Sequence, residues 1–454
     1  MPAKITEVVV KDIRFPTSLE AHGSDAMHTD PDYSCAYVII HTDSNDALEG
    51  HGPTFTIGRG TEVVVAAVEA MTFHLIGQDV QAIFDDFGGF WRKFVADSQL
   101  RWLGPEKGVV HLATAAIMNA LWDLWAKREK KPLWKLLVDM DPEKLVACVD
   151  FTYISDCITR EEALAILKKN SDTKHERESF LKENGFPAYT TSVGWLGYSD
   201  ERIQKKCQDA LKDGWTMFKM KVGANLEDDI RRAKIIRQEI GYENALMMDC
   251  NQRWGVHEAI EWMKPLAEFK PKWIEEPTSP DDVLGHAAIA KALNPLGIGV
   301  ATGEHCHNRV MFKQFLQSGA MQYCQIDSCR IGGVNEILGP ANGQEMSSVC
   351  EYVDHLREHF VYPVEMKGPN YLPPTKPGYS TELKPGSIED HLYPNGRVWE
   401  ELRKEGKIKN SFGSFSFLCF NNFYKFCIFL FGLLFHFQLL SLGHLCITHS
   451  QTGL

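Results

Sequence analysis

The sequence lacks features that define several classes of protein. Its twelve cysteines form no CxxC pair and follow no regular spacing, which predicts a reduced intracellular protein with buried thiols. Residues 1–15 contain Glu7 and Asp12 within an apolar, strand-like run, unlike a secretory signal peptide or an acid-poor transit sequence.

Positive charge is also in short supply. The chain has 48 Lys and Arg against 60 Asp and Glu, a formal net charge of −12, so nucleic acid is not an expected partner. A small anionic substrate is still compatible with this charge, because one bound metal ion reverses the sign of the field inside a cleft.

The last part of the chain has no acidic residue. Residues 411–454 contain no Asp or Glu, and residues 426–442 (FCIFLFGLLFHFQLLSL) carry no formal charge over 17 positions. That length is the lower limit for a membrane span. We interpret residues 411–454 as an uncharged, aromatic-rich tail foreign to the preceding domain, with a tail-anchored membrane protein as the alternative.

With 454 residues the chain predicts two domains. Residues 1–135 are interpreted as an α+β domain, in which strands come first and helices follow from Thr61. Residues 109–127 predict a long helix with a broad apolar face, which Pro132 stops. Residues 136–187 are interpreted as a linker with helices that leads to a different pattern.

Short buried-strand patterns recur after residue 187, each followed by a helical segment. They are 25 to 30 residues apart and begin near Ala188, Phe218, Ala245, Lys272, Gly297 and Tyr323. Repeated strand–helix units of this length predict a parallel sheet with crossover helices, and the (β/α)8 barrel fits best. A doubly wound open sheet is the alternative, disfavoured because no glycine-rich phosphate loop follows the first strand.

The repeat breaks off early. Two more strands are expected near residues 349 and 375, but the sequence there is interpreted as helical and then loop-like, after a break at Gly339-Pro340. The expected fold class is therefore α/β: an α+β capping domain and a (β/α) barrel over residues 188–338 that is truncated to about six strand–helix units. Residues 339–410 are interpreted as a C-terminal segment that returns to the capping domain.

Lys219 and Lys221 lie two positions apart in the run FKMKVG, so their side chains point the same way from a strand. Such a pair on most strands is only a solvated face, but this strand is otherwise apolar, which favours function. Two ammonium groups so close disfavour each other's protonation, which predicts a lysine pKa lowered toward that of a general base.

Acidic residues end the next three predicted strands, Asp249 after ALMM, Glu275 after KWI and Glu304 after GIGVATG. Strand ends of a parallel barrel meet on one face, where buried carboxylates repel one another unless a cation joins them. Oxygen ligands shared with substrate and water suit Mg²⁺. His305 and His307 leave zinc as an alternative that no Cys/His spacing supports.

Together these motifs resemble the enolase superfamily in its mandelate-racemase-like branch, and most specifically the L-fuconate dehydratases. The resemblance is carried by KMK, MMDCNQ, WIEEP, ATGE, the upstream ALWDLWAK, FPTS, HTDPDYS, LRWLGPEKGVVHLATAA and QIDSCR. It covers about residue 5 to Glu336 and resumes from Val349 to about residue 400.

The resemblance implies a metal-assisted removal of a proton next to a carboxylate, in which a Lys or His base and Mg²⁺ form an ene-diolate. Loss of the 3-hydroxyl then gives a 2-keto-3-deoxy acid. The residue roles that it implies are Asp249, Glu275 and Glu304 as Mg²⁺ ligands, Glu304 also at the substrate, Lys221 as an acid/base, Lys219 in contact with the substrate, and Gly23, Ser24, Asp25 and Tyr33 in a capping loop over the sugar.

This chain departs from the family pattern in one region. The family pairs the Asp of the sixth strand, here Asp327, with a His at the end of the seventh, and places an acidic residue at the end of the eighth. Both partners are expected to be missing with the absent segment; His355 and His359 are poor substitutes because they lie in what is interpreted as a terminal helix. We therefore expect impaired turnover and a splice or gene-model variant.

Two other functions stay open: a non-catalytic metal-binding or interaction protein on the same scaffold, and the tail-anchored membrane protein. The expected partner is a small acid sugar, with a homo-oligomer compatible and a membrane reached only through the tail. The expected location is the mitochondrion or the cytosol, in soluble form.

Overall fold

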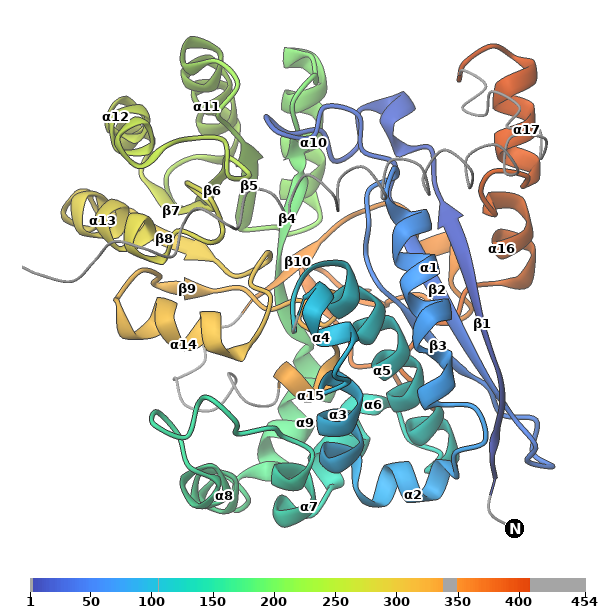
Figure 1. The fold of residues 1–454 in the computed structure, drawn as a ribbon. Coiled ribbons are helices and arrows are strands. Elements are labelled where there is room, and N and C mark those ends of the chain that lie inside the picture. Colours follow the sequence, from blue (N-terminus) through green and yellow to red (C-terminus); the bar gives the residue numbers. More distant parts are fainter. Residues whose placement is uncertain (1–2, 105, 338–348, 409–454) are drawn as a thin grey trace, which may run out of the picture. The chain divides into compact units, whose positions relative to one another are not determined.

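The computed structural model describes residues 3–104, 106–337 and 349–408 (Figure 1). The chain divides into two compact units, Met1–Arg397 and Val398–Leu454. In the second unit the described residues are 398–408, which hold most of helix α17 (Arg397–Lys404). The tail predicted at 411–454, including the stretch considered as a membrane span, lies outside the described residues.

The first unit begins with an antiparallel sheet of three strands in the order β1 (Ile5–Arg14), β2 (Ser34–Thr42) and β3 (Gly50–Pro53). Ala36, Val38 and Ile40 on one face of β2 are buried and pack with the first helices into one core, whereas Tyr37 and Ile39 on the other face pack with Leu383 and Ile388. The α-helices of this part are α1 (Thr61–Met71), α2 (Val80–Asp85), α3 (Phe87–Val95), α4 (Leu100–Leu103), α5 (Gly108–Arg128), α6 (Leu133–Asp139), α7 (Pro142–Ala147), α8 (Arg160–Lys169) and α9 (Lys174–Asn184).

Helix α5 is the predicted long helix, and it forms the centre of this core. It is long and apolar enough to cross a membrane, but 83% of its most apolar window is buried inside the protein. A helix that is apolar all round is typical of a core position. Strand β3 approaches it closely because of glycine: a Cβ atom on Gly52 would lie 2.2 Å from the carbonyl oxygen of Ala116.

A parallel sheet follows, with strands where the sequence predicts them. They pair in chain order and are β4 (Phe186–Gly194), β5 (Met217–Lys221), β6 (Ala245–Asp249), β7 (Pro271–Glu275), β8 (Gly299–Thr302) and β9 (Tyr323–Cys324). The helices between and after them are α10 (Asp200–Lys212), α11 (Leu226–Ile240), α12 (Val256–Leu266), α13 (Val283–Leu293), α14 (Arg309–Gln317) and α15 (Val334–Ile337).

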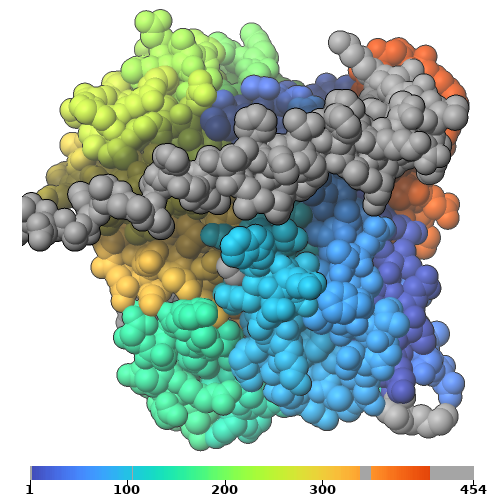
Figure 2. Space-filling model, in the orientation of Figure 1, coloured from blue at the N-terminus to red at the C-terminus, as the bar shows by residue number. Residues whose placement is uncertain are grey.

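Helices α10 to α14 flank the outer side of these strands (Figure 1), and α11 to α14 form part of the surface in the space-filling view (Figure 2). The α+β part followed by a parallel β/α part is the predicted fold class. The strand ends that carry Lys221, Asp249 and Glu275 are aligned, because Lys221 pairs with Asp249 and Asp249 with Glu275 in the sheet register.

The helix expected after residue 349 is not formed. Instead of a helix, Cys350–Tyr352 form strand β10, which runs parallel to β4 with Glu351 opposite Tyr189. Strand β10 lies close to the position 349 that the repeat spacing calls for. It pairs with β4 and, in the part of the chain that the structure describes, not with β9.

The interpretation as a helix failed because the exposed edge of β4 offers backbone partners that local sequence does not reveal. A short hairpin of β11 (Met366–Lys367) and β12 (Asn370–Tyr371) also pairs with β4. Farther on, α16 (Pro385–His391) contacts β1, so this part of the C-terminal segment does lie against the first sheet.

Candidate active site

The two lysines of β5 lie at the centre of a buried ion cluster. Nζ of Lys221 is 2.6 Å from Oδ2 of Asp249 and donates to Oδ1 of Asn251 at 2.8 Å. Nζ of Lys219 is 2.8 Å from Oε1 of Glu275 and 3.3 Å from Oδ2 of Asp249. The carboxylates are fully buried and the lysines nearly so. The structure thus brings four of the predicted site residues together at adjacent strand ends.

The predicted lowering of a lysine pKa is wrong for this cluster. Burial alone would lower the pKa of Lys219, but the charges of Glu275, Glu351 and Asp249 outweigh it and raise the pKa well above its ordinary value. Burial and the neighbouring ammonium also act to lower the pKa of Lys221, and the Asp249 carboxylate reverses that effect. The prediction included the repulsion between the two lysines but left out the attraction of the carboxylates on the next two strands.

The carboxylates respond to the same charges in different ways. Burial would raise the pKa of Asp249, but the ammonium groups of Lys221 and Lys219 hold it well below its ordinary range. Burial and the nearby Asp249 charge raise the pKa of Glu275 to about 8. Burial and the nearby Glu276 charge raise the pKa of Glu304 to about 7. The site therefore holds more negative charge than its lysines neutralise.

Glu304 lies on the β8 side of the site with different neighbours. Among the described residues, Glu276, Glu304 and His305 form a group that could bind a metal, because their possible ligand atoms all lie within 4.8 Å of one another. Nδ1 of His305 is 2.7 Å from Oε1 of Glu276, and Gln252 donates to Oε2 of that carboxylate at 2.8 Å. The carboxylates of Asp249 and Glu275 instead form ion pairs with the lysines of β5.

The chemistry of the predicted ligands fits a hard divalent cation, but among the described residues these three carboxylates do not form one group within 4.8 Å. Asp249, Glu275 and Glu304 offer carboxylate oxygens at three successive strand ends, and two of these groups have raised pKa values that an added positive charge would reverse. His305 joins Glu276 and Glu304 in that group, and because zinc also binds His with carboxylates, the zinc alternative stays open.

Glu351 is a site residue that the sequence analysis missed. It lies on β10, and its Oε1 is 3.2 Å from Nζ of Lys219. The hydroxyl of Tyr189 donates to its Oε2 at 3.2 Å. The expectation that the acidic residue of the eighth strand is absent is therefore wrong. The run VCEYV, 26 residues after Tyr323, was the signal that could have found it.

The predicted capping loop also lies near the lysines. Ser24 and Asp25 are buried, and the carbonyl of Ser24 accepts from the backbone N–H of Leu196 beyond β4 at 3.1 Å. Gly23 has φ +76°, and a Cβ there would lie 2.6 Å from the Tyr33 hydroxyl. The Asp25 charge contributes to the raised pKa of Lys221, which indicates that this loop faces the end of β5.

Asp327 follows β9 without a histidine partner. Its Oδ1 accepts from the backbone N–H of Cys329 at 2.8 Å, and no histidine of the described residues pairs with it. His355 follows β10 in a loop, and His359 lies in a 3-10 turn (Arg357–His359), not in the helix that the sequence predicted.

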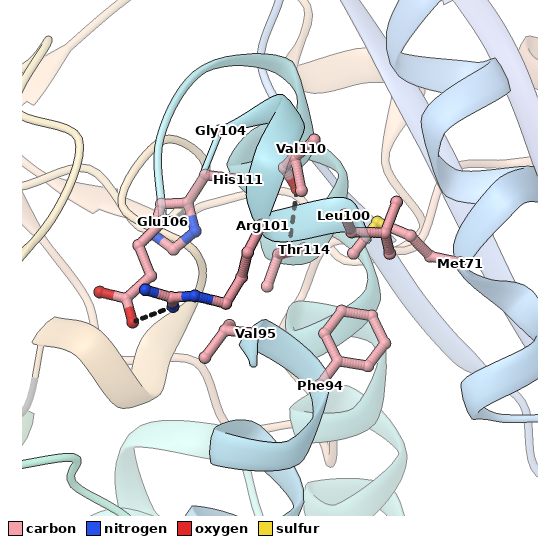
Figure 3. Close-up of a pocket in the computed structure, with 10 residues that line it drawn as sticks. All are labelled: Met71, Phe94, Val95, Leu100, Arg101, Gly104, Glu106, Val110, His111 and Thr114. Atoms are coloured by element: carbon pink, nitrogen blue, oxygen red, sulfur yellow. Dashed lines mark hydrogen bonds and ion pairs between the residues drawn. The ribbon is translucent and has the colours of Figure 1, made fainter. Parts of the chain in front are cut away.

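Two cavities lie outside this ion cluster. One, between α3, α4 and α5 (Figure 3), has a volume of about 10 Å³, and its Arg101–Glu106 ion pair of 4.0 Å lies at one side. The other, of about 360 Å³, lies beside the start of α14 and is lined by His307 and Asn308 among others. Neither is lined by a residue that the sequence assigned to the site.

The sequence matches two family profiles in succession. Residues 13–138 match the mandelate racemase / muconate lactonizing enzyme N-terminal domain, and residues 202–349 match the enolase C-terminal domain-like family. The chain belongs to the enolase superfamily, in its mandelate racemase and muconate lactonizing enzyme branch. Its relatives include named dehydratases, which places the chain in the dehydratase lineage of the superfamily.

Three superfamily relatives illustrate the similarity. Mitochondrial enolase superfamily member 1 of Homo sapiens is 58% identical over 433 residues, covering 88% of this chain and 98% of that protein. Its crystal structure superposes with a TM-score of 0.86 at 57% identity, over 88% of this chain and 99% of that chain. L-galactonate dehydratase of Hypocrea jecorina is 49% identical over 425 residues, covering 86% and 94%. A racemase from Streptomyces coelicolor with bound magnesium gives a TM-score of 0.64 at 25% identity, covering 84% and 97%.

Proposed function

We propose that this chain is a Mg²⁺-dependent acid-sugar dehydratase that converts L-fuconate to 2-keto-3-deoxy-L-fuconate and water. The observation that carries the proposal is the buried cluster in which Lys219 and Lys221 face Asp249 and Glu275. The names of relatives, among them L-galactonate dehydratase, support an acid sugar as the substrate class. L-fuconate itself rests on the motif resemblance.

Asp249, Glu275 and Glu304 would hold the Mg²⁺ ion. When bound, the ion supplies positive charge that stabilises the charge developing on the substrate carboxylate. Lys221 is the residue that moves the proton at the neighbouring carbon, since its Nζ is buried at the end of β5. Lys219, held by Glu275 and Glu351, binds the substrate, and the loop with Gly23, Ser24, Asp25 and Tyr33 covers the sugar.

We also propose that turnover is impaired. Asp327 has no histidine partner among the described residues, so one acid/base of the family pattern is absent. A positioned acid or base contributes about 10²–10⁴-fold to a rate. A non-catalytic metal-binding protein is the second candidate, favoured by the same observation. The relatives' names support a mitochondrial location, with the cytosol as the alternative, and a homo-oligomer stays a prediction.

The test is turnover of L-fuconate with Mg²⁺ and with EDTA, with the keto acid detected directly, for the chain and its Lys221→Ala variant. The human relative, assayed in parallel, sets the unimpaired rate. We expect slow, Mg²⁺-dependent product formation that Lys221→Ala abolishes. A rate equal to the relative's contradicts the impairment. Mg²⁺-dependent thermal stabilisation without any product supports the non-catalytic candidate.

A further inference from the structure

The capping loop contains a histidine–carboxylate pair that the proposed mechanism does not yet use. Nδ1 of His28 is 3.0 Å from Oδ2 of Asp25. Oδ1 of the same carboxylate accepts from the backbone N–H groups of Met27 at 2.7 Å and His28 at 2.6 Å. The Asp25 carboxylate is thus fixed by three donors, and it fixes the orientation of the imidazole in turn.

This arrangement leaves the other ring nitrogen available. Within the described residues, Nε2 of His28 has no hydrogen-bond partner, and the side chain is 34% exposed. The carboxylate at Nδ1 favours the imidazolium form, in which Nε2 carries a proton that can be donated. The hydrogen bond from Asp25 is also the largest cause of the raised pKa of His28.

The pair lies within electrostatic range of the ion cluster. The charges of Lys221 and Glu304, from β5 and from the residue that follows β8, both act on His28. The Asp25 charge acts on Lys221. The loop is tied to the residues after β4 through the bond between Leu196 and Ser24. The loop that carries His28 is therefore tied to the end of β4, and His28 lies within electrostatic range of Lys221 and Glu304.

We propose that the Asp25–His28 pair is the second proton-transfer group of the dehydration, with Nε2 of His28 protonating the hydroxyl that leaves. The inference rests on the proposed dehydratase function. It explains how water loss proceeds although Asp327 has no histidine partner among the described residues. Other histidines fit less well. His305 belongs to the group of possible metal-binding residues with Glu276 and Glu304, and both ring nitrogens of His355 are buried.

The step balances in atoms and electrons. The Lys221 ammonium, which Asp249 holds in this structure, first loses a proton to solvent once a cation at Asp249 displaces it from that carboxylate. As the free amine, Lys221 then takes the proton from the carbon next to the carboxylate, and the electron pair of that C–H bond forms the carbon–carbon double bond. The C–O bond to the neighbouring hydroxyl breaks with its electrons on oxygen. The Nε2 proton of the imidazolium joins that oxygen to give water. Lys221 ends as an ammonium group and His28 as neutral imidazole, and exchange with solvent restores both.

The test separates the two proton transfers in the full chain with Mg²⁺. In D₂O, deuterium uptake at carbon 2 of L-fuconate reports proton removal by Lys221, and keto-acid formation reports water loss. We expect His28→Asn to keep the deuterium uptake and to slow water loss about 100-fold or more. His175→Asn, a substitution at an exposed histidine of α9, is the matched control and should change neither rate.

A second measurement excludes a merely structural effect of the loop. An analogue with fluorine in place of the leaving hydroxyl needs no proton on its leaving group. We expect wild type and His28→Asn to release fluoride at similar rates. If His28→Asn loses water as fast as wild type, or loses fluoride as slowly as water, the inference is overturned. If wild type shows neither deuterium uptake nor water loss, the dehydratase function itself fails.

Discussion

Nζ of Lys221 lies 2.6 Å from Oδ2 of Asp249, so the residue proposed to move a proton is held by a residue proposed to bind the metal. The register of β5 and β6 sets this contact, because the two residues are direct neighbours in the sheet. A cation that binds Asp249 competes with this ion pair. Metal binding and the position of the lysine are therefore linked.

Glu304→Gln tests the metal site with little risk to the fold. Within residues 3–104, 106–337 and 349–408, Glu304 forms no ion pair, whereas substitution of Asp249 would leave a buried lysine charge unpaired at a cost of about 3–5 kcal/mol. A ligand that binds only the folded state raises its stability. We expect Mg²⁺ to raise the Tm of wild type and of Glu261→Gln, a control at an exposed position of α12, and to raise it much less in Glu304→Gln.

Lys221→Arg tests whether the residue at the end of β5 acts as a base or only through its positive charge. Arginine keeps the positive charge beside Asp249 but cannot act as a base near neutral pH. We expect Lys221→Arg to stay folded and to lose proton removal by about 10²-fold or more, measured as deuterium uptake at carbon 2. Uptake at the wild-type rate would show that another residue removes the proton.

Glu351→Gln tests whether β10 contributes to the site. Glu351 is one of the charges that raise the pKa of Lys219, so its removal weakens the hold on that ammonium group. A lost charge-assisted hydrogen bond of about 1.5–3 kcal/mol corresponds to roughly a tenfold or larger fall in kcat/KM. Glu358→Gln, at a side chain that is 70% exposed, should leave kcat/KM unchanged and serves as the control.

Glu336→Gln should change how stability depends on pH. Arg309 is bound by Glu106, Asp150 and Glu336, and burial and the neighbouring carboxylates raise the pKa of Glu336 to about 7 although Arg309 opposes them. Because this pKa is raised in the folded state, Glu336 contributes stability below about pH 4.5 that is lost as the pH rises toward 7.

The size of that loss is at most about 3 kcal/mol. We expect the free energy of unfolding of wild type, from urea titrations, to fall between pH 4.5 and 7 by more than that of Glu336→Gln. Identical pH profiles for the two proteins would show that Glu336 ionises in the folded state at its ordinary pKa.

The sequence was most informative where side-chain chemistry and repeat spacing agree. Apolar runs 25 to 30 residues apart located β4 to β9, and charged residues at their ends located the lysines and carboxylates. The periodicity of apolar residues follows directly from strand geometry, so a strand can be recognised in the sequence without knowing which strands pair with it. The sequence could predict that Lys219 and Glu275 lie near each other. The directions of their pKa shifts depend on distances that only the structure supplies.

Tertiary context decided what the sequence missed. Strand β10 is three residues long and forms because the edge of β4 is available, so no local pattern separates it from a helix. Glu351 was missed for the same reason. His28 was passed over because a single histidine in a polar loop carries no signal until the Asp25 contact is known.

Asp249, Glu275 and Glu304 are proposed to bind one divalent ion. A crystal of the chain soaked in Mn²⁺, which substitutes for Mg²⁺ and scatters anomalously, tests this most directly. We expect a single anomalous peak within bonding distance of all three carboxylates, with Lys221 displaced from its 2.6 Å contact with Asp249. A peak confined to Glu276 and His305, or no peak in the cluster, would contradict it.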